Sequence, residues 1–396
     1  WQDDRSGGMK MDMTRLEAEF RVVTPLFMGG ANPLTAELRA PSVKGVLRFW
    51  WRALALGRLG SVESVRAEEA RIFGSTKGQS NFKIRISPPK REEKLRRKHV
   101  LNYNGGGVAG EGARYLGYGV IEASSGELIR QCIRYPLEES GKLELLFRPN
   151  TPEDDIWSVE AALVAMGFFG GLGSRSRKGY GSFNLVNLKR GGENEPLFTM
   201  PNDLDGLKKA LLSLFDQDQN ERYKITPFGR LPPYTAFSVS EKMRVDIMDK
   251  GEEPLKLLNS IGEKMMEYRS YLKSKTFWDD HDLLIDAISG KPIANHPRRV
   301  IFGLPNNYHF RNGGGNSIVK PKAHERRASP LFIHIQQLSK DKYVAIAAII
   351  PAEFLPDGEK IMVEKSPVNV NVDYGVLNDF IDGKGTPRFA SRVRVI

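Results

Sequence analysis

A chain of 396 residues with 40% hydrophobic and 27% charged residues has the composition of a folded globular protein, and its length makes two domains the expectation. Its single cysteine, Cys132, excludes an intrachain disulfide and a cysteine-rich zinc site and points to the reducing cytoplasm. The net charge of +11 favours a polyanionic partner, above all nucleic acid, because clustered cations release counterions when they bind phosphates.

Two kinds of segment can be judged first: possible membrane spans and the N-terminal residues. The longest apolar runs, around residues 163–169 and 343–350, are far shorter than the roughly 20 residues that cross a bilayer, so no membrane is expected as a partner. The first eight residues, WQDDRSGG, look like the remainder of an expression tag, and we expect the native chain to begin at Met9 or Met11.

The N-terminal half opens with a clean alternation of apolar and polar residues over residues 14–23, which predicts a half-buried strand. After a loop rich in glycine and proline, helical spacing predicts a helix over residues 40–54 with Ser42 as its N-cap. Residues 88–112 combine a basic run with a glycine run and predict a mobile basic insertion. A second helix is expected from its N-cap Thr151 to Gly170, followed by a strand over residues 180–187.

This order of strand, helix, hairpin-like middle, helix and strand is that of a ferredoxin-like β-α-β-β-α-β unit, also called RRM-like. After a polar linker at residues 188–198, further strands are expected at 223–225, 235–240, 331–335 and 343–350, and helices at 254–272 and 281–287. The predicted fold class is therefore α+β. We expect two ferredoxin-like domains with insertions, one at residues 9–198 that carries the basic insertion and one at residues 199–396.

The first predicted helix carries an unusual charge pattern. Trp50 belongs to the apolar stripe that should pack on a sheet, whereas the neighbouring face carries Lys44, Arg48, Trp51 and Arg52. Three cations on one stripe repel one another unless an anion compensates. We therefore predict that they hold RNA phosphates while Trp51 stacks on a base. The alternative is a solvated helix face with Trp51 packed under a loop.

The segment GGLGSRSRKGYGSF, residues 170–183, is the second candidate. Its glycines would allow close approach to a ligand, and its cations favour phosphate. It matches neither a Walker loop nor a dinucleotide fingerprint, and it matches only the first half of the RNP1 pattern. The predicted RNA-binding residues are Gly171, Gly173, Arg175, Arg177 and Lys178, with Tyr180 as a second residue for base stacking. The alternative is a structural glycine turn with surface charges.

Other polar clusters are weaker. Arginine pairs at residues 298–299 and 326–327 each precede an apolar strand, where they could extend a basic surface or merely protect the strand against aggregation. The sequence offers few candidates for catalytic residues. The acids of WDDHD at residues 278–282 are better explained as helix capping than as a metal site. The six histidines are scattered and match no hydrolase or metalloprotease motif. No catalytic residue, metal or cofactor is predicted.

Together these motifs resemble the RAMP superfamily of CRISPR proteins. TPLFMGGANP with AELRAPSVKGVLRFWWRAL looks like the N-terminal signature of the first-numbered subunits of type III-B Cmr effector complexes, and residues 170–183 look like the superfamily's G-rich loop. The resemblance implies two ferredoxin-like domains, no catalysis by this subunit, and a place near the 3′ end of the guide RNA among other Cmr subunits. Its motifs lie mainly in the first half of the chain.

The predicted function is thus a non-catalytic binder of single-stranded RNA, guide or target, in an antiviral type III-B complex in the cytoplasm. Two alternatives stay open. One is a metal-independent endoribonuclease of the same superfamily that cuts CRISPR repeat RNA with a histidine, although such enzymes usually carry it early and this chain has none before His99. The other is a pure assembly subunit whose basic faces bind acidic proteins.

Overall fold

The computed structural model describes residues 13–32, 34–96, 110–122, 124–215, 231–238, 242–270, 276–310, 315–383 and 388–396. The expected start of the native chain, most of the basic insertion with His99, and the strand expected at 223–225 lie outside the described residues. The described part is a mixed α+β protein with antiparallel sheets, as the sequence predicts at the level of fold class. None of its helices is long and apolar enough to span a membrane.

The N-terminal sheet is built around the strand predicted from alternation. This strand, β1 (Arg15–Val22), buries every second side chain, and it pairs with β5 (Gly141–Phe147) and β6 (Phe183–Arg190). With the outer strands β2 (Phe82–Ser87) and β7 (Phe198–Thr199) the order is β2-β5-β1-β6-β7, all antiparallel. The strand expected at 180–187 thus exists but is shifted towards the C-terminus.

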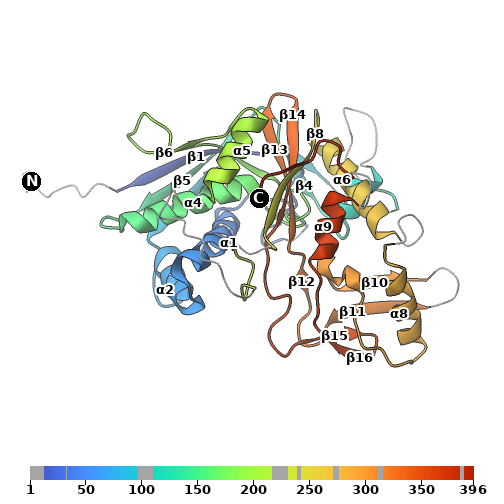
Figure 1. Ribbon diagram of the computed structural model, residues 1–396. Coiled ribbons are helices and arrows are strands. Elements are labelled where there is room, and N and C mark those ends of the chain that lie inside the picture. Colours follow the sequence, from blue (N-terminus) through green and yellow to red (C-terminus); the bar gives the residue numbers. More distant parts are fainter. Residues whose placement is uncertain are drawn as a thin grey trace, which may run out of the picture.

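Helices cover one face of this sheet (Figure 1). They are α1 (Ala40–Leu59), α2 (Val62–Phe73), α4 (Glu153–Phe169) and α5 (Leu204–Ser213). Both predicted N-caps are wrong: α1 is preceded by Arg39 and α4 by Pro152, and neither has a side-chain cap. In α1 a proline in the first turn, with its fixed φ, begins the helix in place of a capping side chain, whereas Pro152 itself occupies the N-cap position of α4.

A second sheet of four strands lies in the C-terminal half, in the order β13-β14-β8-β17. Its strands are β8 (Arg244–Gly251), β13 (Leu331–Ser339), β14 (Lys342–Ile349) and β17 (Val393–Arg394). The longer helices of this half are α6 (Pro254–Arg269), α8 (Trp278–Ile288) and α9 (Gly375–Asp382). The strand predicted at 235–240 is wrong where it is described, since residues 235–238 are irregular. The strand β8 was missed.

Smaller elements complete the fold. A four-stranded sheet of β10 (Asn306–His309), β11 (Asn316–Pro321), β15 (Lys360–Val363) and β16 (Ser366–Asn369) lies beside α8 (Figure 1). Two short pairs join β3 (Glu93–Leu95) to β4 (Cys132–Arg134) and β9 (Gly303–Leu304) to β12 (Arg327–Ala328). Further helical turns within the described residues are α3 (Glu111–Leu116) and η2 (Arg298–Phe302).

The two halves pack tightly together. The helix α4 is buried on nearly all sides, because it contacts α1 and β6 of the first half and β13 and β14 of the second. Buried Asn184 of β6 donates to the Ile335 carbonyl (2.9 Å) and accepts from the Gln337 amide (2.7 Å) of β13. The Nδ1 atom of His334 lies 2.8 Å from the Gly170 carbonyl oxygen. Strand β13 therefore lies beside the segment predicted as the G-rich loop.

Candidate nucleic-acid interface

The cationic stripe of α1 is compensated inside the protein. Both Arg48 and Arg52 donate to Oε1 of Glu69, a buried carboxylate on α2, with Arg52 at 2.8 Å. Lys44 lies over the Phe82 ring, 4.7 Å from its centroid, and burial, followed by repulsion from Arg48, lowers its pKa. The repulsion that the sequence left unexplained is thus relieved by a neighbouring helix, so RNA is not needed to explain this stripe.

Trp51 belongs to the core. Its side chain is 1% exposed, its indole Nε1 donates to Ser158 Oγ of α4 at 2.8 Å, and its ring meets the edge of Phe73 at 5.8 Å. The prediction that Trp51 stacks on a base is therefore wrong, because no face of the ring is open. The sequence could not reveal this, since Ser158 follows 107 residues later.

The helix and the glycine loop do converge, but through another stripe of α1. At 100° per residue, Ser42, Gly45 and Phe49 lie next to the cationic stripe, and these residues share a pocket with Gly171 and Arg177. Lys44, Arg48 and Arg52 do not line this pocket, so the cationic stripe of α1 does not share it with the glycine loop.

The glycines of the loop serve its packing against the protein. At Gly173, φ is +76°, and an added Cβ would lie 2.4 Å from the Phe27 carbonyl oxygen; the Ser174 amide donates to that same oxygen at 2.7 Å. An added Cβ at Gly171 would meet the Tyr180 carbonyl oxygen at 3.0 Å. These two glycines therefore allow the chain to fold on itself, which is the structural alternative raised above.

Tyr180 also points inwards. It is fully buried, its hydroxyl donates to the Ala113 carbonyl at 2.7 Å, and its ring meets the edge of Phe27 at 5.5 Å. The prediction that Tyr180 stacks on a base is therefore wrong. An aromatic residue that the sequence did not single out, Tyr118, is 60% exposed and lies close to Arg175.

The guanidinium of Arg177 is fixed against the second half. It donates to the Ser329 carbonyl at 2.7 Å and lies over the rings of Phe332 and Phe49, at 4.4 and 5.5 Å from their centroids. Burial, followed by repulsion from Arg327, lowers its pKa to about 10. Arg177 is therefore still charged at neutral pH, and it is held rigidly by stacking.

Lys178 is the least satisfied cation of the loop. Its Nζ atom is buried and has no hydrogen-bond partner among the described residues, although the residue as a whole is partly exposed. Burial, followed by repulsion from Arg269, Arg175 and Arg177, lowers its pKa to about 7. A buried amine without a partner costs free energy, so its presence suggests an anion that arrives from outside.

Two segments far from the loop in the chain bring further arginines to this place. Repulsion from Arg326 contributes to the lowered pKa of Arg175, after burial. Arg269, at the end of α6, lies over Phe302 at 4.9 Å. We call the combined set the junction cluster: Arg175, Arg177, Lys178, Arg269, Arg326 and Arg327. In the part of the chain that the structure describes, no carboxylate forms an ion pair with any of its members.

The two arginine pairs of the second half have different roles. Arg299 is neutralised by buried Asp280, at 3.1 Å, and Asp280 also accepts from the Arg298 amide. The pair at residues 326–327 instead joins the junction cluster. Of the two pairs, only the one at residues 326–327 therefore lies beside the cations of the glycine loop.

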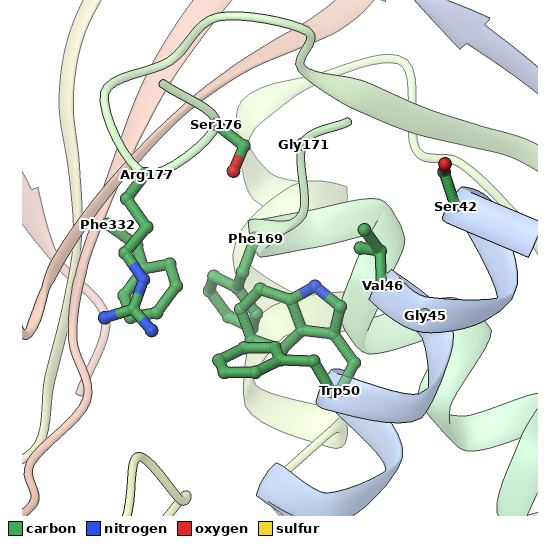
Figure 2. A pocket seen from close by; sticks show the side chains of 10 residues that line it. Ser42, Gly45, Val46, Trp50, Phe169, Gly171, Ser176, Arg177 and Phe332 are labelled. Carbon is green, nitrogen blue, oxygen red and sulfur yellow. The ribbon is translucent and has the colours of Figure 1, made fainter. Parts of the chain in front are cut away.

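A pocket lies between α1, the glycine loop and β13 (Figure 2). Its volume is about 250 Å³. Trp50 and Phe169 lie at its base, Arg177 and Phe332 form one side, and Ser42 and Val46 of α1 face them (Figure 2). The remaining lining residues are Gly45, Phe49, Gly171 and Ser176. Trp50 is 2% exposed, as the sequence predicts for a core residue, whereas the pocket joins segments too far apart for the sequence to indicate it.

The polar clusters considered for catalysis have structural roles where they are described. The acids Asp279 and Asp280 occupy the first turn of α8, where they complement the helix dipole. Among the described residues there is no group of three or more histidine, cysteine or acidic side chains placed to hold a metal ion. Burial lowers the pKa of His334 to about 4, so this histidine is neutral at physiological pH.

Comparisons with known proteins agree with the sequence motifs. Residues 19–184 match the model of the RAMP superfamily. The chain is 26% identical over 357 residues to the CRISPR system Cmr subunit Cmr1-1 of Pyrococcus furiosus, with 87% of each chain covered. It is 29% identical over 177 residues to Cmr1-2 of the same organism, which covers 43% of this chain and 95% of that relative.

A solved structure shares the fold. The crystal structure of apo Cmr1 from Pyrococcus furiosus matches with a TM-score of 0.54 at 20% identity, covering 96% of this chain and 98% of that one. The resemblance inferred from the sequence is therefore confirmed: the chain is similar to the RAMP superfamily over residues 19–184 and to a Cmr1 subunit over most of its length.

Proposed function

We propose that this chain is a non-catalytic RNA-binding subunit of a type III-B CRISPR (Cmr) complex, where it holds guide or target RNA as a single strand near the 3′ end of the guide. Its similarity to Cmr1 subunits along most of its length supports the assignment. The cytoplasm and the other Cmr subunits as partners belong to the same proposal, and the buried free thiol of Cys132 agrees with a reducing compartment.

One observation carries the proposal: six cations meet at the junction of the two halves without a carboxylate among the described residues to pair with them. By contrast, the buried cation Arg244 is paired with Asp246 and Asp382. Phosphates of a nucleic acid would supply the missing negative charge. Contacts of this kind give affinity that depends on salt and depends little on base sequence.

The cations of α1 have a lesser part in the proposal. Arg48 and Arg52 share one carboxylate, which leaves one positive charge in excess, and each side chain remains about one third exposed, at 36% and 37%. Together with Lys44 they can attract a polyanion from a distance. They are already ordered by Glu69, so they add less to binding than the junction cluster does.

The arrangement of strands supports two ferredoxin-like domains, with the boundary near residues 198–199. The first half runs β1-α1-β2-β5-α4-β6 with the sheet order β2-β5-β1-β6. The second half runs β8-α6-β13-β14-α9-β17, and its sheet order is β13-β14-β8-β17. In both, the second strand in chain order lies at one edge, followed by the third, the first and the fourth. The other elements would then be insertions.

The test removes charge from exposed members of the junction cluster. In the double variant Arg175→Ala/Arg326→Ala, we expect the affinity for a labelled single-stranded RNA to fall about tenfold and the slope of log K against log salt to become shallower by about 1.4, which is roughly 0.7 for each lost phosphate contact. Fluorescence anisotropy over a salt series measures both quantities.

The matched control removes the same charge from the edge strand β2. Lys83 and Arg85 are exposed there, and the variant Lys83→Ala/Arg85→Ala should retain affinity and slope. Equal losses in both variants would show that net charge alone is responsible and would contradict the proposed site. The same samples, incubated with CRISPR repeat RNA and EDTA and run on a denaturing gel, test the endoribonuclease alternative: a discrete product overturns the non-catalytic role.

A further inference from the structure

We infer that the pocket between α1, the glycine loop and β13 receives one nucleobase of the bound strand. This inference rests on the proposed RNA-binding function and adds to it a site for a base, where the junction cluster accounts only for phosphates. The pocket is an aromatic slot of about 250 Å³, lined by residues from both halves of the chain.

The apolar lining closes the base of the pocket and leaves one ring partly open. Trp50, Phe169 and Phe332 are 2%, 2% and 4% exposed, and their rings pack against one another, with 5.5 Å between the centroids of Trp50 and Phe332. Figure 2 shows Trp50 and Phe169 at the base of the pocket. Phe49 also lines the pocket and is only partly buried, so its ring and the Arg177 guanidinium are the surfaces on which a base would stack. Every base presents a π face, so this stacking would be tolerant of sequence.

The polar groups of the pocket suit the edges and face of a base. Ser42 and Ser176 bring hydroxyl groups, which can donate or accept. The guanidinium of Arg177 stacks on Phe332 and is fixed by the Ser329 carbonyl. A guanidinium plane held in this way is itself a stacking surface for an unpaired base.

The position of the pocket identifies its occupant as part of a nucleic acid strand. Ser176 and Arg177 line the pocket, and Arg177 and Lys178 belong to the junction cluster, so the pocket and the cations are joined through consecutive residues. A nucleotide whose phosphate contacts the cluster can therefore place its own base in the slot. This connection of a cationic site with an aromatic one is typical of single-strand binding.

Gly45 provides a way to fill the pocket without damaging the fold. It is exposed on α1 and lines the pocket, and a Cβ added there meets no atom within 4 Å. A larger side chain would enter the space meant for the base. Because glycine is a poor helix former, replacing it by leucine or alanine should not weaken α1.

The experiment uses a 12-nucleotide single-stranded RNA with 2-aminopurine placed at one position at a time, because the fluorescence of this base is quenched when it stacks on an aromatic ring. We expect strong quenching at one position on binding to the wild-type chain. Gly45→Leu should abolish that quenching and weaken binding about tenfold with an unchanged salt slope, whereas Gly45→Ala should retain both signals. Val46→Phe fills the pocket from the next residue of α1 and should reproduce Gly45→Leu.

The outcomes separate this inference from the proposed function. Salt-dependent binding without quenching at any position, or quenching that survives in both folded filling variants, overturns the base pocket and leaves the phosphate site intact. In Arg175→Ala/Arg326→Ala the quenching should persist at saturating protein although the affinity falls. Free 2-aminopurine riboside is the last comparison. If it is quenched saturably, and as strongly as 2-aminopurine within the RNA strand, the pocket is a site for free nucleobases and the inference is overturned. Absence of any RNA binding would refute the proposed function itself.

Discussion

Replacement of Lys178 by methionine should make the protein more stable and a weaker RNA binder at the same time. The amine is buried without a partner, and its pKa is lowered from an ordinary 10.5 to about 7. Each pKa unit corresponds to about 1.4 kcal/mol of differential interaction. At pH 7 the buried lysine therefore lowers the free energy of unfolding by up to about 4 kcal/mol relative to an exposed lysine. Methionine has a similar length and no charge.

The pH dependence of stability gives the sign of this effect. Between pH 7 and 9 a lysine in the unfolded chain stays protonated, whereas Lys178 in the folded chain loses its proton as the pH rises through about 7. The unfolded state then binds more protons, so the free energy of unfolding should rise with pH by at most about 1.4 kcal/mol per pH unit. In Lys178→Met this component should disappear.

Urea unfolding at pH 7, 8 and 9 and thermal melting measure these quantities. We expect Lys178→Met to melt several degrees higher than the wild type and to bind single-stranded RNA at least tenfold more weakly. Lys83→Met, which changes an exposed lysine of β2, is the control and should alter neither stability nor binding. A destabilised Lys178→Met variant, or an unchanged pH slope, would refute the view that Lys178 is a buried cation that waits for an anion.

Three further changes test the surroundings of the site. Glu69→Ala should lower the free energy of unfolding by about 3 kcal/mol in urea titrations, because it leaves Arg48 and Arg52 without their shared carboxylate; no loss would show that solvent already screens this pair. Gly173→Ala should cost at least 1 kcal/mol by the same measurement, since its φ is +76° and the new Cβ meets a carbonyl oxygen, and a neutral effect would mean that the loop relaxes freely. Asn184→Ala should cost about 3 kcal/mol and speed hydrogen exchange along β13, whose main chain it bonds; slow exchange in that strand would contradict its role in joining the halves.

Much of the secondary structure could be predicted from local pattern. Alternation identified β1, helical spacing identified α1 and α4, and apolar runs identified β13 and β14. These patterns report the burial of each side chain relative to its neighbours in the chain, which is a local property. The ends of the elements and the strand β8 could not be predicted in this way, because helix caps and strand pairing depend on contacts with distant parts of the chain.

The sequence by itself also determined which residue types the candidate site contains, since a cationic loop rich in glycine can be read without a fold. Only the tertiary structure decided which cations are free to act. Glu69 neutralises the stripe on α1 from the next helix, Ser158 draws Trp51 into the core, and Arg326 is brought beside Arg175 from 151 residues away. The physical reason is that the energy of a charge depends on its distance from other charges and from water, and folding alone sets those distances.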